Sequence, residues 1–190
     1  MNGPDRAPYR LIHQDMLLAR PAKRSLVNDP ARFILASMIA GQAAGFGCLP
    51  AHLGLPDDSY YRMLALYFPG AAPAASERSL SDLPEHGDLV KLLLSERAHE
   101  RKAEIWLADI VATACTGQDH LWQDLGLQSR GELNKLMWIA FPGLARANSG
   151  DMKWKKFLYR QVCSREGIYV CPAPSCGVCQ DYAKCFGPEN

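Results

Sequence analysis

The cysteines are the residues of this chain whose type and spacing are best suited to chemistry. The sequence contains seven of them, and five lie between position 163 and the C-terminus. Thiolates are soft ligands, which favour zinc or iron–sulfur clusters over the hard ions that prefer carboxylate oxygens. Four of the five form the pattern C-x4-C-x2-C-x5-C, which predicts a metal centre: Cys171, Cys176, Cys179 and Cys185.

The spacing of these four cysteines bears on which metal they hold. Structural zinc sites usually combine two close Cys or His pairs, but only Cys176-x2-Cys179 is a close pair and no histidine follows His120. The spacing from Cys171 to Cys179 instead matches the opening of the plant-type ferredoxin pattern. We therefore favour an iron–sulfur cluster, and structural zinc or redox-active thiols remain the alternatives.

The other three cysteines have simpler interpretations. Cys163, eight residues before Cys171, is either an additional ligand or a small buried residue. Cys48 and Cys115 end apolar segments, so we expect them to pack in the core. The odd cysteine count and the absence of a signal peptide in the first residues argue against a disulfide framework. Together these features predict a cytoplasmic protein, because thiols stay reduced in that compartment.

Two stretches of the chain resemble each other. Residues 49–55 read LPAHLGL and residues 121–127 read LWQDLGL, and each stretch is followed by a segment that ends in Phe-Pro-Gly. Both segments have apolar residues at the i, i+3, i+4, i+7 spacing of an amphipathic helix. The apolar positions are Tyr60, Met63, Leu64, Tyr67 and Phe68 in the first copy, and Leu133, Leu136, Met137, Ala140 and Phe141 in the second.

Each copy also contains an apolar helix before these stretches. Asp29 and Ser129 are in positions to cap helices. No stretch shows the alternation typical of strands. The sequence predicts an all-α fold of two pseudo-repeated helix pairs in one domain, then a helix and an irregular, cysteine-rich metal-binding tail. The expected parts are a mostly irregular N-terminal arm (1–28), a helical domain (29–166, with copies 29–70 and 96–143 and linker 71–83) and the tail (167–190).

The predicted helix before the tail is basic. We expect Asn148 or Ser149 to cap it, and Trp154, Phe157 and Leu158 to face the core. Its cations Lys153, Lys156 and Arg160 share another face. The formal net charge of only +1 argues against a general nucleic-acid binder. The longest apolar run is also shorter than the ~20 residues that a membrane helix needs.

Three elements together resemble the NifQ family: residues 151–163 (DMKWKKFLYRQVC), residues 120–127 (HLWQDLGL) and the four-cysteine pattern. The resemblance implies a cytoplasmic carrier of a molybdenum–iron–sulfur cluster that supplies molybdenum for the iron–molybdenum cofactor of nitrogenase. It implies Cys171, Cys176, Cys179 and Cys185 as the cluster ligands.

The resemblance also implies molybdate as the molybdenum source and cofactor-assembly proteins, a scaffold and an iron protein, as partners. The basic face is then a candidate surface for an oxyanion or a partner. No catalytic motif is present, so we expect a protein that is not an enzyme. The rival functions are a zinc-stabilised helical interaction module and a small iron–sulfur electron carrier.

Overall fold

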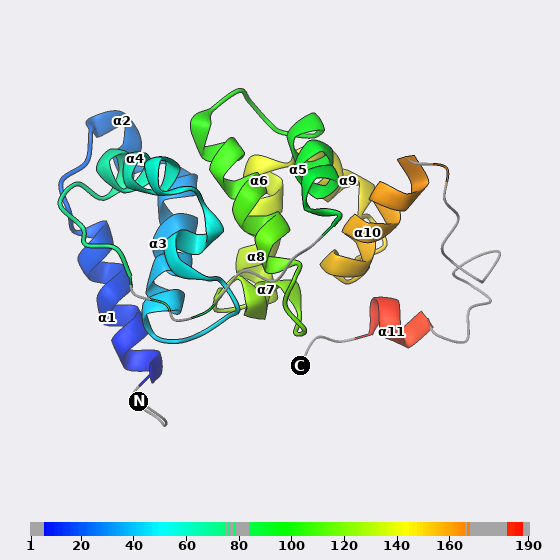
Figure 1. Ribbon diagram of the computed structural model, residues 1–190, viewed down its shortest axis with the longest axis horizontal. Helices are drawn as coiled ribbons and strands as arrows, with labels where there is room; N and C mark the ends of the chain where they lie inside the picture. The colour runs from blue at the N-terminus through cyan, green and yellow to red at the C-terminus, as the bar shows by residue number, and fades with distance from the viewer. Residues whose placement is uncertain are drawn as a thin grey trace.

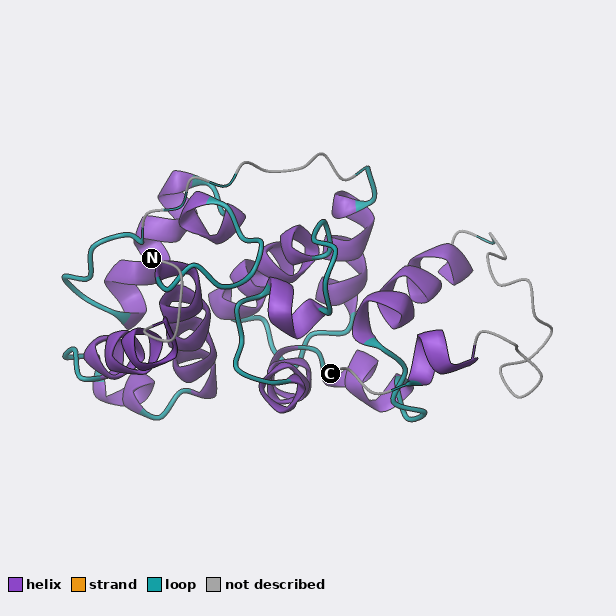
Figure 2. Ribbon diagram, turned by 90° about the horizontal axis from the view of Figure 1, so that it is seen from below, coloured by secondary structure: helices purple, strands orange, loops and turns teal. Residues whose placement is uncertain are grey.

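The protein is described by a computed structural model, which places residues 6–74, 76, 78, 84–165, 167 and 182–187. Helices are the only regular elements in these ranges, which confirms the predicted all-α class (Figure 2). The helices are α1 (Arg6–Leu18), α2 (Arg24–Val27), α3 (Pro30–Ala43), η1 (Ala51–Gly54), α4 (Asp57–Tyr67), α5 (His86–Ser95), α6 (Lys102–Ala114), α7 (Leu121–Asp124), α8 (Arg130–Ala140), α9 (Pro142–Ala147), α10 (Trp154–Arg165) and α11 (Tyr182–Phe186).

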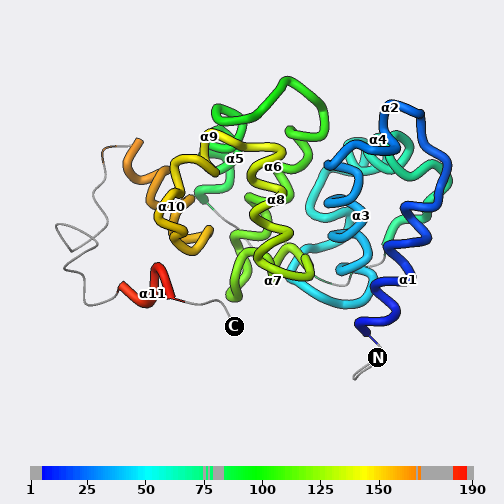
Figure 3. Tube along the Cα trace, turned by 180° about the vertical axis from the view of Figure 1, so that it is seen from behind, coloured from blue at the N-terminus to red at the C-terminus, as the bar shows by residue number. Residues whose placement is uncertain are grey.

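The helices follow one another along the long axis of the molecule. Helices α1 to α4 form one end, α5 to α9 the middle, and α10 and α11 the other end (Figure 1), and the same order is visible from behind (Figure 3). Helices α3 and α6 are apolar nearly all round and almost fully buried, as expected of central helices. One continuous hydrophobic core connects them with the helices around them.

Helices α4 and α8 bury the apolar stripes that the sequence predicted. All ten stripe residues are at most 3% exposed. The two helices also end alike, since the next residues, Phe68 and Phe141, have φ/ψ of −138°/61° and −133°/56°. Pro69 then leads into a turn, whereas Pro142 begins α9 at once. The apolar stripes are therefore confirmed. That the two helix pairs are repeated units of the fold stays a prediction.

The predicted caps of α3 and α8 are present. The Asp29 carboxylate accepts a hydrogen bond from the backbone N–H of Ala31 at 3.0 Å, and Pro30 occupies the first helical position. The Ser129 hydroxyl accepts one from the backbone N–H of Glu132 at 3.3 Å. Both bonds satisfy N–H groups that have no partner within the helix.

The expectation of a mostly irregular N-terminal arm is wrong, because α1 and α2 occupy most of that range. The buried positions of α1 include the polar Arg10 and Gln14, while Ile12 and Met16 are exposed. Polar side chains thus share the inner face of α1 with Leu17, so apolar periodicity did not reveal the helix. The Arg10 guanidinium donates to the carbonyl oxygen of Gly126 at 2.6 Å.

The boundaries after Pro142 also need correction. We expected one helix capped by Asn148 or Ser149, but the chain forms α9, a turn and then α10. The Asn148 side chain binds across this turn instead, donating to the carbonyl of Met152 and accepting from its N–H, each at 2.9 Å. No helix among the described residues is long and apolar enough to cross a membrane.

Candidate metal centre

The structure describes one of the four predicted ligands. Cys185 lies in α11 and is half-buried, whereas Cys171, Cys176 and Cys179 lie outside the described residues. Within the described ranges, no group of three or more His, Cys, Asp or Glu side chains converges to hold a metal. The described residues therefore show how one end of the predicted ligand set is held by the helical body.

Helix α11 is attached at the beginning of α10. The backbone N–H of Lys153 donates to the carbonyl oxygen of Cys185 at 2.7 Å, and its Nζ reaches the carbonyl of Ala183 at 3.5 Å. Cys185 and Phe186 also pack against the edge of the hydrophobic core. Within α11, the rings of Tyr182 and Phe186 stack with their centroids 4.5 Å apart. The backbone position of Cys185 is thereby fixed next to the N-terminal end of α10.

Further contacts fix this end of α10. The Arg130 guanidinium donates to the carboxylate of Asp151 at 2.8 Å and also to its carbonyl at 3.0 Å. The indole N–H of Trp154 donates to the side-chain oxygen of Asn134 at 2.7 Å, and the Trp154 ring is buried. Helix α8 supplies Arg130 and Asn134, so it carries the end of α10 on which Cys185 rests.

A buried ion pair joins α10 to the turn of α7. The Lys155 ammonium contacts the carboxylate of Asp124, and these side chains are 18% and 4% exposed. Lys155 also donates to the carbonyl of Gly117 at 2.8 Å, and the N–H of Asp119 donates to Asp124 at 3.1 Å. These extra bonds satisfy both charges, which a buried pair requires if its desolvation is to be offset.

The sequence analysis missed this ion pair, although one signal was available. Lys155 lies three and seven residues before Leu158 and Val162, both buried, so it falls on the inner face of α10 and not on its solvated face. Nothing in the sequence identifies Asp124 as its partner, because the two residues come from distant elements.

Cys163 lies toward the other end of α10 from Cys185. Ten residues separate it from Lys153, which at 1.5 Å per residue is about 15 Å along the helix axis. That end of the helix packs near α5, where the Arg165 guanidinium donates to Glu96 at 2.9 Å and to Ser95 at 2.8 Å. The structure therefore does not bring Cys163 to Cys185, and its role as an additional ligand stays a prediction.

The three predicted cations of the basic face have different surroundings. Lys156 and Arg160 are exposed and lie one helical turn apart on α10. Lys153 precedes the first residue of α10, is half-buried and reaches the backbone of α11. Positive charge therefore lies directly beside Cys185, where it favours anions.

Cys48 and Cys115 lie near the Asp124–Lys155 pair and have the properties of packed thiols. Cys115 is buried, which confirms the packing prediction, and Cys48 is half-buried with its thiol 3.8 Å from the carbonyl of Ala114. Burial raises the pKa of Cys48 to about 11 and that of Cys115 to about 12. Both thiols are therefore protonated at neutral pH, unlike a metal-ligating thiolate.

The comparison with protein families covers all of these elements from α3 onward. The family model described as NifQ matches residues 34–187, a range that includes the four cysteines of the C-terminal pattern. The chain belongs to the NifQ family. Membership of the NifQ family implies a role in nitrogen fixation and in the processing of molybdenum.

Individual relatives agree with the family match. The protein NifQ of Azotobacter vinelandii is 43% identical over 170 residues, covering 82% of this chain and 87% of the relative. The protein NifQ of Rhodobacter capsulatus is 39% identical over 165 residues, covering 83% and 88%. That of Klebsiella pneumoniae is 47% identical over 81 residues, covering 42% and 48%. No solved structure matches this chain.

Proposed function

We propose that this member of the NifQ family carries a molybdenum–iron–sulfur cluster and supplies its molybdenum for assembly of the nitrogenase iron–molybdenum cofactor. The observation that supports this most strongly is the inclusion of all four patterned cysteines in the family match. In this proposal Cys171, Cys176, Cys179 and Cys185 bind the cluster as cargo. Four thiolates in a short segment are a donor set suited to such a cluster.

The described residues have a supporting role in this proposal. The chain holds Cys185 through backbone and packing contacts at the beginning of α10, so the helical body sets the position of this proposed ligand. The chemistry of loading and delivery is then ligand exchange at the metal, and no catalytic residue is required. We place the carrier in the cytoplasm because its thiols must stay reduced.

Lys153 beside Cys185, and Lys156 and Arg160 on α10, suggest how molybdenum arrives or leaves. We propose that Lys153, Lys156 and Arg160 attract molybdate, or an acidic surface of a cofactor-assembly scaffold or iron protein. Changing Lys156 and Arg160 to glutamate should slow molybdenum loading or transfer, and more so at low salt, because ions screen such attraction beyond about 10 Å at 0.1 M. Equal rates for the variant and the wild type at low salt would contradict this assignment.

Metal analysis of the anaerobically purified protein separates the carrier from the rival functions. The carrier proposal predicts iron, acid-labile sulfide and molybdenum together. Zinc alone would indicate a zinc-stabilised interaction module, and iron and sulfide that never acquire molybdenum from a supplied source would indicate an electron carrier. Either of these results would refute the proposal.

A further inference from the structure

A groove lies between the two halves of the helical body. Its walls come from the segment before α2, from α4 and from α6, and its volume is about 710 Å³. Six of the nine lining residues are apolar. They are Pro21, Ala22, Ala65, Leu66, Pro69 and Trp106.

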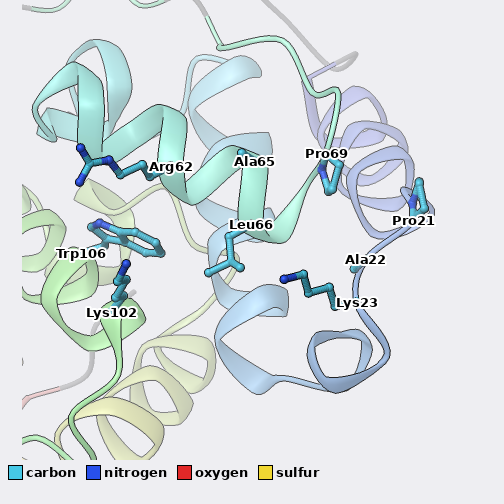
Figure 4. A pocket seen from close by; sticks show the side chains of 9 residues that line it. All are labelled: Pro21, Ala22, Lys23, Arg62, Ala65, Leu66, Pro69, Lys102 and Trp106. Atoms are coloured by element: carbon cyan, nitrogen blue, oxygen red, sulfur yellow. The ribbon is translucent and has the colours of Figure 1, made fainter.

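The other three lining residues are all cations, namely Lys23, Arg62 and Lys102. They are exposed, and Figure 4 shows Lys23 toward one end of the groove and Lys102 toward the other, with Leu66 between them. Arg62 shares its charge with Asp58 in an exposed pair at 3.4 Å. Neither Lys23 nor Lys102 has an acidic partner within the described residues. The groove therefore has an apolar floor and a positive rim.

The chain around the groove increases this positive charge. From Met16 to Asn28 the sequence has three basic residues and no acidic one. Near Lys102, the buried Glu104 already accepts hydrogen bonds from the backbone N–H groups of His99 and Arg101. Among the described residues that line the groove, three are cations and none is acidic, so a complementary ligand is anionic.

We propose that this groove docks an acidic segment of a partner protein, with one large apolar side chain of that segment against Leu66 and carboxylates near Lys23 and Lys102. An apolar floor with a charged rim is the usual anatomy of a protein–protein contact. The two cations lie on either side of the floor, so an elongated segment meets both while its apolar side chain enters between them (Figure 4).

The lining residues favour such a segment over a small anion or a nucleotide. Sites for small ligands place several convergent polar groups around the molecule, but this groove offers no hydroxyl, carboxamide or imidazole side chain. A nucleotide base needs an aromatic face on which to stack, and Trp106 is only 6% exposed. An inorganic oxyanion has no apolar surface to bury against Leu66.

The groove lies away from α10 and α11, the described elements that hold Cys185. Helices α10 and α11 lie at the far end of the long axis from α2 and α4 (Figure 1). A partner in the groove therefore does not cover Cys185 on α11. This inference does not depend on which metal the tail holds, and the apo-protein is suitable for its test.

A phage-displayed library of short random peptides tests the chemistry of the occupant without assuming its sequence. We select it on the full chain and then measure binding of an enriched synthetic peptide by fluorescence anisotropy. The groove variant carries Lys23→Glu and Lys102→Glu. The matched control carries Lys135→Glu and Arg146→Glu, which change two exposed cations on α8 and α9. Circular dichroism melting verifies that both variants are folded.

We expect enriched peptides to carry Asp or Glu around a Leu, Phe or Trp, and to bind the groove variant about tenfold or more weakly than the wild type and the control. Leu66→Gln should weaken binding while leaving the rim charges unchanged. The inference is overturned if the enriched peptides have no acidic excess, or if the groove variant and the control bind equally. It is also overturned if ATP or molybdate displaces the peptide at concentrations where chloride of equal ionic strength does not.

Discussion

His52 and Asp124 occupy corresponding positions in the two similar segments, LPAHLGL and LWQDLGL, but they make different contacts. His52 binds the nearby carboxylate of Asp57 at 2.8 Å and stacks on Tyr60, both a few residues away. Asp124 contacts Lys155 on α10, which lies 31 residues further along the chain. The polar contacts of His52 therefore stay local, although η1 packs against α6, whereas Asp124 attaches the helix on which Cys185 rests.

The backbone differs at the same place. His52 and Leu53 both have left-handed φ values, of 57° and 58°, a conformation that costs a residue with a side chain about 1–2 kcal/mol. In the second segment α7 is an ordinary helical turn that ends at Asp124. Segments with similar apolar spacing can therefore adopt different backbones, a turn with left-handed residues in one half and an ordinary helical turn in the other.

The largest effect should come from Asp124→Asn. This change leaves the buried Lys155 ammonium without its carboxylate, so we expect a loss of about 3–5 kcal/mol in the free energy of unfolding. Urea denaturation followed by circular dichroism measures it. The double variant Asp124→Leu with Lys155→Met should recover much of the loss, since both charges are then removed. A loss below about 1 kcal/mol for Asp124→Asn would mean that the pair behaves like an exposed one.

A smaller difference in the free energy of unfolding should separate alanine variants of the corresponding glycines, Gly54 and Gly126. Both have left-handed φ values, of 84° and 69°, so alanine is strained at either position. A Cβ at Gly54 would lie 2.7 Å from the side chain of Thr113, whereas one at Gly126 would have no atom closer than 3.5 Å. Gly54→Ala should therefore destabilise by about 1–3 kcal/mol more than Gly126→Ala in the same denaturation assay. Equal losses would show that Thr113 moves aside freely.

The smallest effect should come from the local pair of the first segment. Asp57 is 80% exposed, so Asp57→Asn removes a solvent-screened interaction with His52 and should cost at most about 1 kcal/mol. Unfolding measured in parallel with Asp124→Asn gives the comparison directly. If the two variants lost similar free energy, the proposed difference between a local and a long-range contact would be wrong.

Much of the helical body was predictable because its helices bury apolar residues at regular spacing. The stripes of α4 and α8 and the caps at Asp29 and Ser129 followed from the sequence for this reason. Helix α1 was missed because it buries Arg10, whose partner is the backbone of Gly126. A bond between residues so distant in the chain leaves no periodic signal.

In the candidate metal centre, too, some features were predictable from the sequence and others were not. Thiolate spacing and the family resemblance predict the four ligands, because ligand type and spacing are properties of the sequence itself. The attachment of Cys185 to Lys153 was not predictable, since it is a backbone hydrogen bond that any residue type can make. The separation of Cys163 from Cys185 likewise depends on where α11 docks.

The most direct test of the carrier account is the iron and molybdenum content of two single-cysteine variants purified without oxygen. Cys185→Ser removes a proposed ligand, and Cys163→Ser removes a cysteine that lies about 15 Å along α10 from Lys153, the residue that binds the Cys185 backbone. The account predicts that Cys185→Ser loses both metals together while its helical circular dichroism is unchanged, and that Cys163→Ser retains both. Full metal retention in Cys185→Ser, or a loss confined to Cys163→Ser, would contradict it.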